Sequence, residues 1–213
     1  MNEIRVTLVG DGSSDKALIN IIKWVLNDSF SGLAIKCVYA DFRNLPKPPL
    51  KSQILEQIKY ADKYYPFDIL IYHRDAERTD NNVVQKRKEE VLNSLSSDYS
   101  NRVVCIVPIV MMETWLLIDE MSIKKAAGNR NYKDSINLPS VSSLETIKDP
   151  KERLHTLLKE VSGLKKRSLK AFNVHEAVHL VSENINDFSL LRKLSSFQAF
   201  EKDVKDKLIE LGY

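Results

Sequence analysis

The first half of the chain alternates short apolar runs with segments that carry apolar residues at helical spacing. The pattern predicts strands at residues 4–10, 33–40, 67–73 and 102–110, and helices near residues 15–26, 52–65 and 83–95. The apolar runs are continuous, which is typical of strands buried on both faces. Because each helix falls between two strands, we expect an α/β fold with a mainly parallel sheet, Rossmann-like, covered by helices on both faces. Pro108 disfavours strand pairing at the end of the fourth run.

The second half of the chain has a different pattern. Residues 124–144 are polar and lack a clear period, so we expect a loop or insertion there. Asp149 and Pro150 are typical of a helix start, with an N-cap acceptor and a proline in the first turn. Further helices are predicted from Asn173 and from about Ser196. We therefore expect an α/β domain over residues 1–120 and a helical extension, residues 121–213, packed on the same domain.

Composition places limits on the class of protein. A chain of 213 residues with 43% hydrophobic residues can form one sizeable core. Its 32 basic and 29 acidic residues are too evenly balanced to indicate a nucleic-acid binder from totals alone. Cys37 and Cys105 both lie in apolar runs, and no Cys-x-x-Cys pair exists, so we expect buried thiols in a reducing compartment. With no charged leader and no long apolar stretch, we expect a cytoplasmic protein without membrane contact.

Acidic residues follow the ends of three predicted strands. Asp11 and Asp15 come after the first run, Asp75 and Glu77 after the third, and Glu113 after the fourth. The carboxyl ends of parallel strands form one edge of a sheet, so these carboxylates are expected to meet. Neighbouring carboxylates repel one another, and a hard divalent ion, Mg²⁺ or Mn²⁺, would keep them charged together. The pattern therefore predicts a metal site at this edge.

Each acid also has a simpler interpretation. Asp15 could be an acid in a first helical turn, favoured by the helix dipole, and Glu113 could cap a helix start in which Trp115 is buried by packing. Asp75 and Glu77 lie two residues apart, so on extended backbone both would point the same way and could reach one ion or two adjacent ions. The alternative for this pair is a polar strand end followed by a solvated loop.

Two nucleotide-binding motifs fit the sequence poorly. The turn from Gly10 to Asp15 matches the opening of the dinucleotide-binding fingerprint, and Asp41 lies where a ribose-binding acid could. However, Asp11 and Asp15 would face the phosphates, and Asp15 replaces the third glycine. A phosphate-binding loop of the Gly-Lys-Ser or Gly-Lys-Thr type is absent from the sequence. The charge of this turn therefore disfavours a nicotinamide, flavin or nucleotide phosphate cradle.

The C-terminal part contains a compact basic run. It consists of Lys165, Lys166, Arg167 and Lys170. These cations could contact the phosphate backbone of a nucleic acid, or they could form an ordinary solvated face. His175 and His179 have a spacing compatible with a metal, but no zinc motif surrounds them, so we interpret them as surface or packing residues.

Together these residues resemble a Toprim-type fold, and more closely a family of small uncharacterised prokaryotic Toprim-like proteins. The resemblance covers about the first 120 residues: the Asp11-Gly12-x-x-Asp15 turn, Asp75-x-Glu77, and the segment Glu113 to Asp119, Glu-x-Trp-Leu-Leu-x-Asp, which is the most specific part. The start of the last helix at Ser196 and Phe197 is also similar. Asp11 stands where the family usually has glutamate, and Glu77 where it has aspartate, so the resemblance implies metal binding more strongly than activity.

The resemblance implies a magnesium-dependent site for phosphoryl transfer. It implies Asp11, Asp75, Glu77 and Glu113 as catalytic residues and metal ligands, with Asp15 and Asp119 completing or orienting the ligand shell. The leading expectation is a nuclease acting on DNA or RNA, and the resemblance extends this to a toxin or phage-defence effector with an ATPase protein partner. One alternative is a non-catalytic module that binds nucleic acid or protein through its C-terminal helices. Another is an enzyme acting on nucleotides or other small phosphorylated metabolites.

Overall fold

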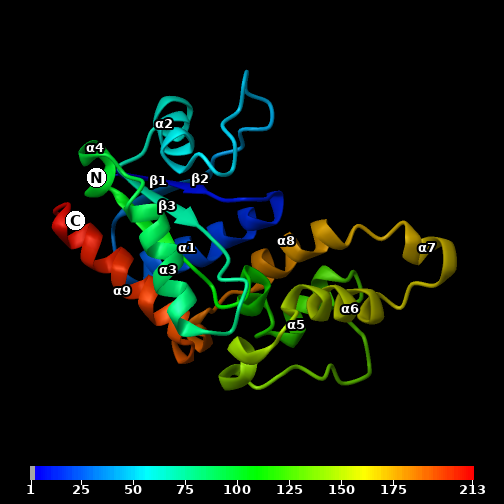
Figure 1. Ribbon diagram of the computed structural model, residues 1–213. Helices are drawn as coiled ribbons and strands as arrows, with labels where there is room; N and C mark the ends of the chain where they lie inside the picture. Colours follow the sequence, from blue (N-terminus) through cyan, green and yellow to red (C-terminus); the bar gives the residue numbers. More distant parts are fainter. Residues whose placement is uncertain (1–2) are drawn as a thin grey trace.

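A computed structural model describes residues 3–213, apart from the side chain of Asn81, and confirms the α/β class with an all-parallel sheet of four strands (Figure 1). The strands are β1 (Glu3–Val9), β2 (Ala34–Tyr39), β3 (Ile69–His73) and β4 (Val103–Ile106). The helices are α1 (Leu18–Ser29), α2 (Ile54–Tyr64), α3 (Asn81–Leu92), α4 (Ser97–Ser100), α5 (Glu120–Ala126), α6 (Pro150–Ser162), α7 (Lys166–Lys170), α8 (Val174–Asn184) and α9 (Ser195–Glu210). Short 3-10 segments span Ser13–Ala17, Met112–Leu116, Val141–Thr146 and Ser189–Lys193.

The order of the strands determines where a ligand crevice can open. The sheet has the order β2-β1-β3-β4. The chain leaves β1 toward β2 on one side and leaves β3 toward β4 on the other side. The direction of the connections therefore reverses between β1 and β3. In open α/β sheets, ligands bind outside the carboxyl ends of the strands at such a switch point.

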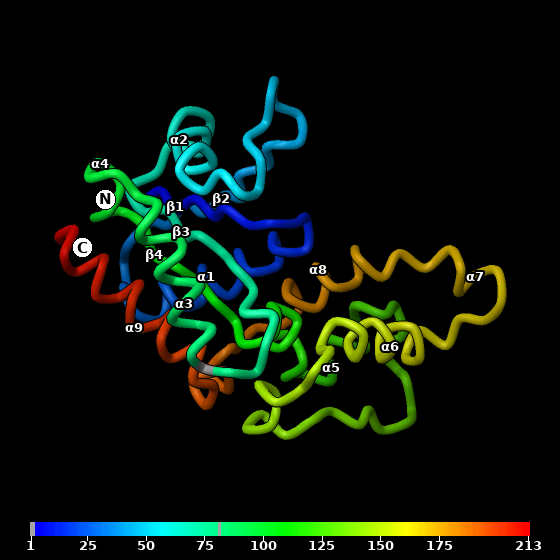
Figure 2. The backbone as a smooth tube through the Cα atoms, viewed as in Figure 1, coloured from blue at the N-terminus to red at the C-terminus, as the bar shows by residue number. Residues whose placement is uncertain are grey.

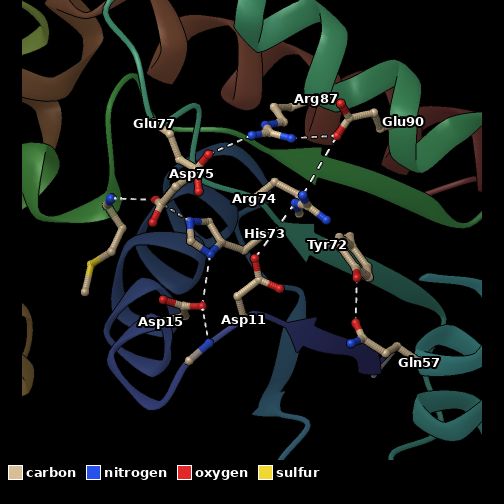
Figure 3. Close-up of polar contacts among 12 residues, drawn as sticks. Asp11, Asp15, Gln57, Tyr72, His73, Arg74, Asp75, Glu77, Arg87 and Glu90 are labelled. Atoms are coloured by element: carbon tan, nitrogen blue, oxygen red, sulfur yellow. Dashed lines mark hydrogen bonds and ion pairs between the residues drawn. The ribbon is translucent and has the colours of Figure 1, made fainter. Parts of the chain in front are cut away.

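Successive side chains of β3 point to opposite faces of the sheet and pack against two different layers of helices. Ile69 and Ile71 belong to the core cluster that contains α1 and α9, whereas Leu70 and Tyr72 pack with residues of α2 and α3. The Tyr72 hydroxyl donates a hydrogen bond of 2.5 Å to Oε1 of Gln57 in α2 (Figure 3). Since side chains alternate with a period of two, His73 follows Ile69 and Ile71 onto the α1 side of the sheet. This parity brings His73 to the start of α1.

The helical extension shares the core of the sheet. One continuous apolar cluster runs from β1 through Trp115 to α6, α8 and α9. Trp115 is fully buried, packs edge-on against Phe197 at 5.3 Å between ring centroids, and donates to Oγ of Ser196 at 3.2 Å. This confirms the packing role predicted for Trp115. Figure 2 shows the chain leaving α8 and returning along the sheet as α9.

Several element boundaries differ from the sequence expectation. β4 ends at Ile106, four residues before the expected limit, and the chain then bends at Ile109 and Val110, where Val110 has a positive φ of 64°. The range 124–144 contains the end of α5 and part of a 3-10 segment as well as loop. Asp149 and Asn173 cap α6 and α8 as predicted. Within residues 3–213, no helix combines the length and apolarity that a membrane crossing needs.

Loss of the Phe197 ring should destabilise the whole fold, because this ring joins the extension to the sheet core. We expect Phe197→Ala to lower the free energy of unfolding by about 3–5 kcal/mol. Ile209→Ala in the same helix is the matched control: Ile209 is 64% exposed, so its loss should change stability by less than about 0.5 kcal/mol. Urea unfolding followed by circular dichroism measures both, and equal effects would contradict a shared core.

Candidate functional site

The candidate site lies at the carboxyl ends of β1 and β3, where the strand connections reverse (Figure 3). Parallel pairing aligns Val9 with Tyr72, so the register places the turn after β1 beside His73. A third segment joins them, because the backbone N–H of Met112, in the loop after β4, donates to Asp75. Residues that are distant in sequence therefore meet at the edge where the acidic residues were predicted.

His73 lies at the centre of these segments. It is buried, with 1% of its surface exposed. Its Nε2 is hydrogen-bonded to Oδ1 of Asp75 at 3.1 Å. Its Nδ1 lies 3.1 Å from Oδ2 of Asp15, an ion-pair distance without the alignment of a hydrogen bond. One imidazole thus bridges acids from the loops after β1 and β3.

The two acids keep this imidazole charged. Burial by itself lowers the pKa of His73, but the negative charges of Asp15 and Asp75 and their contacts outweigh burial and raise the pKa to about 10. Burial raises the pKa of Asp15, and the charge of His73 with hydrogen bonds from the turn outweighs it, so this pKa lies below its ordinary value. At neutral pH the site therefore contains a buried imidazolium between two carboxylates.

Backbone groups hold the same two carboxylates in place. The N–H of Gly12 donates to Oδ2 of Asp15 at 2.9 Å, and the N–H of Met112 donates to Oδ1 of Asp75 at 3.0 Å. A Cβ atom at Gly10 would lie 2.5 Å from Oδ2 of Asp15, so only glycine lets the backbone approach this acid. The glycine turn, which resembles a phosphate cradle in sequence, holds a carboxylate in the structure.

A chain of alternating charges leads outward from this centre. Asp11 lies 3.8 Å from Nε of Arg74, and Arg74 lies 3.8 Å from Glu90 in α3. Arg87 then forms ion pairs with both Glu90, 2.9 Å from its Nη1, and Glu77, 2.8 Å from its Nη2. Burial raises the pKa of Asp11, although Arg74 and His73 oppose the rise. The outer acids are therefore partly neutralised by arginine.

Glu77 does not point with Asp75 as the sequence suggested. β3 ends at His73, and Glu77 has a positive φ of 62°, so strand alternation does not extend to it. Its side chain is 70% exposed and its carboxylate is paired with Arg87 (Figure 3). The expectation of extended backbone between Asp75 and Glu77 is therefore wrong.

Glu113, in the 3-10 segment after β4, is deeply buried. Only 3% of it is exposed. Burial raises the pKa of Glu113 to about 6, and the negative charges of Asp75 and Asp15 add to the rise. Glu113 therefore shares the electrostatic environment of the site. Asp119 has a different place: it caps α5, accepting from the N–H of Met121 at 3.0 Å and contacting the Ser122 hydroxyl.

The basic run lies apart from the acids. Its residues are exposed and most of them form α7, which Figure 1 shows at the far end of the helical extension. His175 packs edge-on against His155, with ring centroids 5.3 Å apart, while His179 is half-buried on the next turn of α8. The structure does not bring Lys165, Lys166, Arg167 or Lys170 to the edge of the sheet that carries Asp75.

Carboxylate oxygens are suitable ligands for a hard divalent ion, but the acids of this site are not positioned as a complete metal-binding site. Within residues 3–213, no three His, Cys, Asp or Glu side chains are arranged to hold a metal ion. Four carboxylates (Asp11, Asp15, Asp75 and Glu113) face two cations, His73 and Arg74. When all are ionised, two negative charges remain, carried by the oxygen donors that Mg²⁺ prefers.

His73 and Arg74 are the two site residues that sequence reasoning missed. Both lie in the same segment as Asp75, directly after the apolar residues of β3. The parity of Ile69 and Ile71 places His73 on a buried face, and a buried histidine between acids is a cation. This signal was present in the sequence.

Loss of the imidazolium should destabilise the protein in a pH-dependent way. We expect His73→Gln to lower the free energy of unfolding by about 3–5 kcal/mol at pH 7, because Asp15 and Asp75 lose their counter-ion. Since the pKa of His73 is raised by folding, its contribution is complete below about pH 6.5 and is lost as the pH approaches 10. The difference between wild type and variant should therefore shrink between pH 7 and 10. Denaturant unfolding measures it, with the exposed His175→Gln as control; a constant difference would contradict the assignment.

Neutralising Glu113 should have the opposite effect on stability. The folded pKa of about 6 exceeds the ordinary value of 4.5, so ionisation of Glu113 costs stability above pH 6 and nothing below about pH 4.5. We expect Glu113→Gln to gain about 2 kcal/mol relative to wild type on going from pH 4.5 to pH 8. Unfolding curves recorded with a chelator test this, and a gain that is the same at both pH values would refute it.

Comparison with known proteins identified no relative of this chain. No protein-family model, curated protein or solved structure matches the chain. Function is therefore inferred from the chemistry of the site itself.

Proposed function

We propose that this chain is a Mg²⁺-dependent phosphodiester hydrolase, a nuclease, acting at the carboxyl ends of β1 and β3. The observation that supports it is that Asp11 and Asp75 follow β1 and β3 at the switch point of the sheet, with Glu113 near enough for the charge of Asp75 to raise its pKa. The resemblance of these residues and of the Glu113 to Asp119 segment to Toprim-type proteins supports the same function. On that resemblance, we also propose DNA or RNA as substrate and an ATPase partner in phage defence.

Asp11, Asp75 and Glu113 would hold the ion, Mg²⁺ or Mn²⁺. In Asp75, Oδ1 is hydrogen-bonded to His73 and Met112, which leaves the second oxygen for an ion. The Asp11 side chain is 38% exposed, so it can rotate toward an ion. When bound, such a cation acidifies a water molecule and stabilises the leaving oxygen.

The other residues of the site would position the metal ligands and neutralise the charge of a bound phosphate. The His73 ring holds Oδ1 of Asp75 in place, so the second oxygen of Asp75 stays available as a ligand. Arg74, next to Asp11, offers a guanidinium for a bound phosphate. Glu77 and Asp119 are engaged elsewhere, by Arg87 and by the cap of α5, and so lie outside this proposed ligand set.

A second candidate function is a binding module without catalysis. The observation that favours it is His73 itself, because a protonated ring already neutralises Asp15 and Asp75 without a metal. Under this alternative, nucleic acid would bind with or without divalent ions, and removal of the acids would leave binding unchanged.

Cleavage assays with matched acid variants test the proposal. Purified protein is incubated with plasmid, single-stranded DNA and RNA in Mg²⁺ or Mn²⁺. We expect Asp75→Asn and Asp11→Asn each to lower the cleavage rate by about 100-fold or more, since each removes an anionic ligand. Asp11 takes no part in the His73 ion pair, so this variant should fold normally. Glu77→Gln removes the same charge beside Arg87 and should change the rate by less than about twofold.

Two outcomes would contradict the proposal. One is no cleavage by wild type of any of these substrates, alone or with the product of a neighbouring gene. The other is full activity in Asp11→Asn and Asp75→Asn. Binding of nucleic acid by wild type and Asp11→Asn alike, without cleavage, would favour the second candidate.

A further inference from the structure

A cleft opens beside the acidic site, along the free edge of the sheet. It has a volume of about 810 Å³ and lies between the start of α1, the edge strand β2 and α8. A smaller pocket of about 180 Å³ is lined by Asp11, Gly12 and Lys51. The two share Ser13, Tyr39, Asp41 and Arg43 as lining residues. A continuous path therefore leads from Asp11 to the edge of the sheet.

One face of the first helical segment lines this path with cations. Lys16, Ile19, Asn20 and Lys23 all line the cleft, and their spacing places them on one helical face. Both lysines are exposed, and neither forms an ion pair with any residue of the described range 3–213. Lys51, at the other end of the path, lies near enough to lower the pKa of Asp11. Asp41 and Glu183 also line the cleft; Asp41 is paired with Arg43 at 2.5 Å, so Lys16 and Lys23 outnumber the one remaining acid, Glu183.

Aromatic rings form part of the opposite wall. The Tyr39 hydroxyl donates to the carbonyl of Gly12 at 2.8 Å, and the Tyr65 hydroxyl donates to the carbonyl of Asp41 at 2.8 Å. These bonds fix two half-buried rings beside the lysines. Fixed tyrosine rings next to a row of cations are the combination used to bind single-stranded nucleic acid, with bases stacked on rings and phosphates on cations.

We propose that this cleft binds a single strand of DNA or RNA and leads its backbone from Lys23 and Lys16 past Lys51 to Asp11. The inference rests on the proposed function, since it assigns the substrate class of that site. Lys16 and Lys23 are seven residues apart, about 10 Å along a helix, which exceeds the span of one phosphate and favours a chain over a mononucleotide. The basic run of α7 is at the far end of the extension and has no part in this path (Figure 1).

Binding measured without divalent ions tests the cleft independently of hydrolysis. Wild type and the double variant Lys16→Gln/Lys23→Gln are titrated with fluorescent 12-nucleotide DNA and RNA single strands in chelator. We expect the double variant to bind about 25-fold more weakly at 0.1 M salt, and the slope of log K against log salt to fall by about 1.4. The double variant Lys165→Gln/Lys170→Gln carries the same charge change in α7 and should bind within about twofold of wild type.

Three outcomes would overturn the proposal. One is wild-type affinity in the Lys16→Gln/Lys23→Gln variant. Another is an equal loss in both double variants, because net charge alone would then explain binding. The third is a mononucleotide that binds as tightly as the 12-nucleotide strands. Thermal melting of each variant confirms that the fold is retained. Strand binding through the cleft without cleavage in Mg²⁺ would refute the proposed function and leave this binding site standing.

Discussion

The arrangement of the site depends on one buried imidazolium. His73 touches Asp15 from the loop after β1 and Asp75 from the loop after β3, and Asp75 in turn accepts from the backbone of Met112. Each of these charges alone would lose several kcal/mol of hydration on burial. Together they compensate one another, so the three segments are stable only in this mutual arrangement. The sheet brings the loops near one another, and the ion pairs determine their final positions.

The fold follows from the sequence because its signals are local. Continuous apolar runs indicated the four strands, and the helix between each pair indicated parallel crossovers. The errors occur where local pattern and tertiary packing differ. Val110 is apolar and was assigned to β4, but it lies beyond the end of that strand in a bend, with a positive φ. The end of α5 was missed because its polar residues give a weak period, although Ile123 is fully buried.

The site was only half predictable, for a physical reason. Asp11 and Asp75 lie after β1 and β3 at one edge of the sheet, as their positions after strands predict, but within residues 3–213 no three carboxylates are arranged to hold a metal ion. Glu77 was misplaced because strand alternation was extended from His73, the last residue of β3, to a residue with a positive φ of 62°. His73 was missed because a cluster of acids was assumed to need an external ion. A cluster of acids requires a cation, and a protonated side chain in the same segment satisfies that requirement as well as a metal can.

The negative charges of the acids in the site are not all neutralised to the same extent, and this difference bears on how a ligand reaches them from the cleft. The inner pair, Asp15 and Asp75, shares the charge of His73, whereas Asp11 and Glu113 keep pKa values raised by burial and by neighbouring acids. Asp11 also lines the small pocket that shares Ser13, Tyr39, Asp41 and Arg43 with the cleft, so its carboxylate lies at the inner end of that path. A polyanion would be repelled by these acids on a direct approach. Lys16 and Lys23 on the α1 side of the cleft would offset that repulsion, so under the proposed function a phosphodiester chain would approach along the edge of β2.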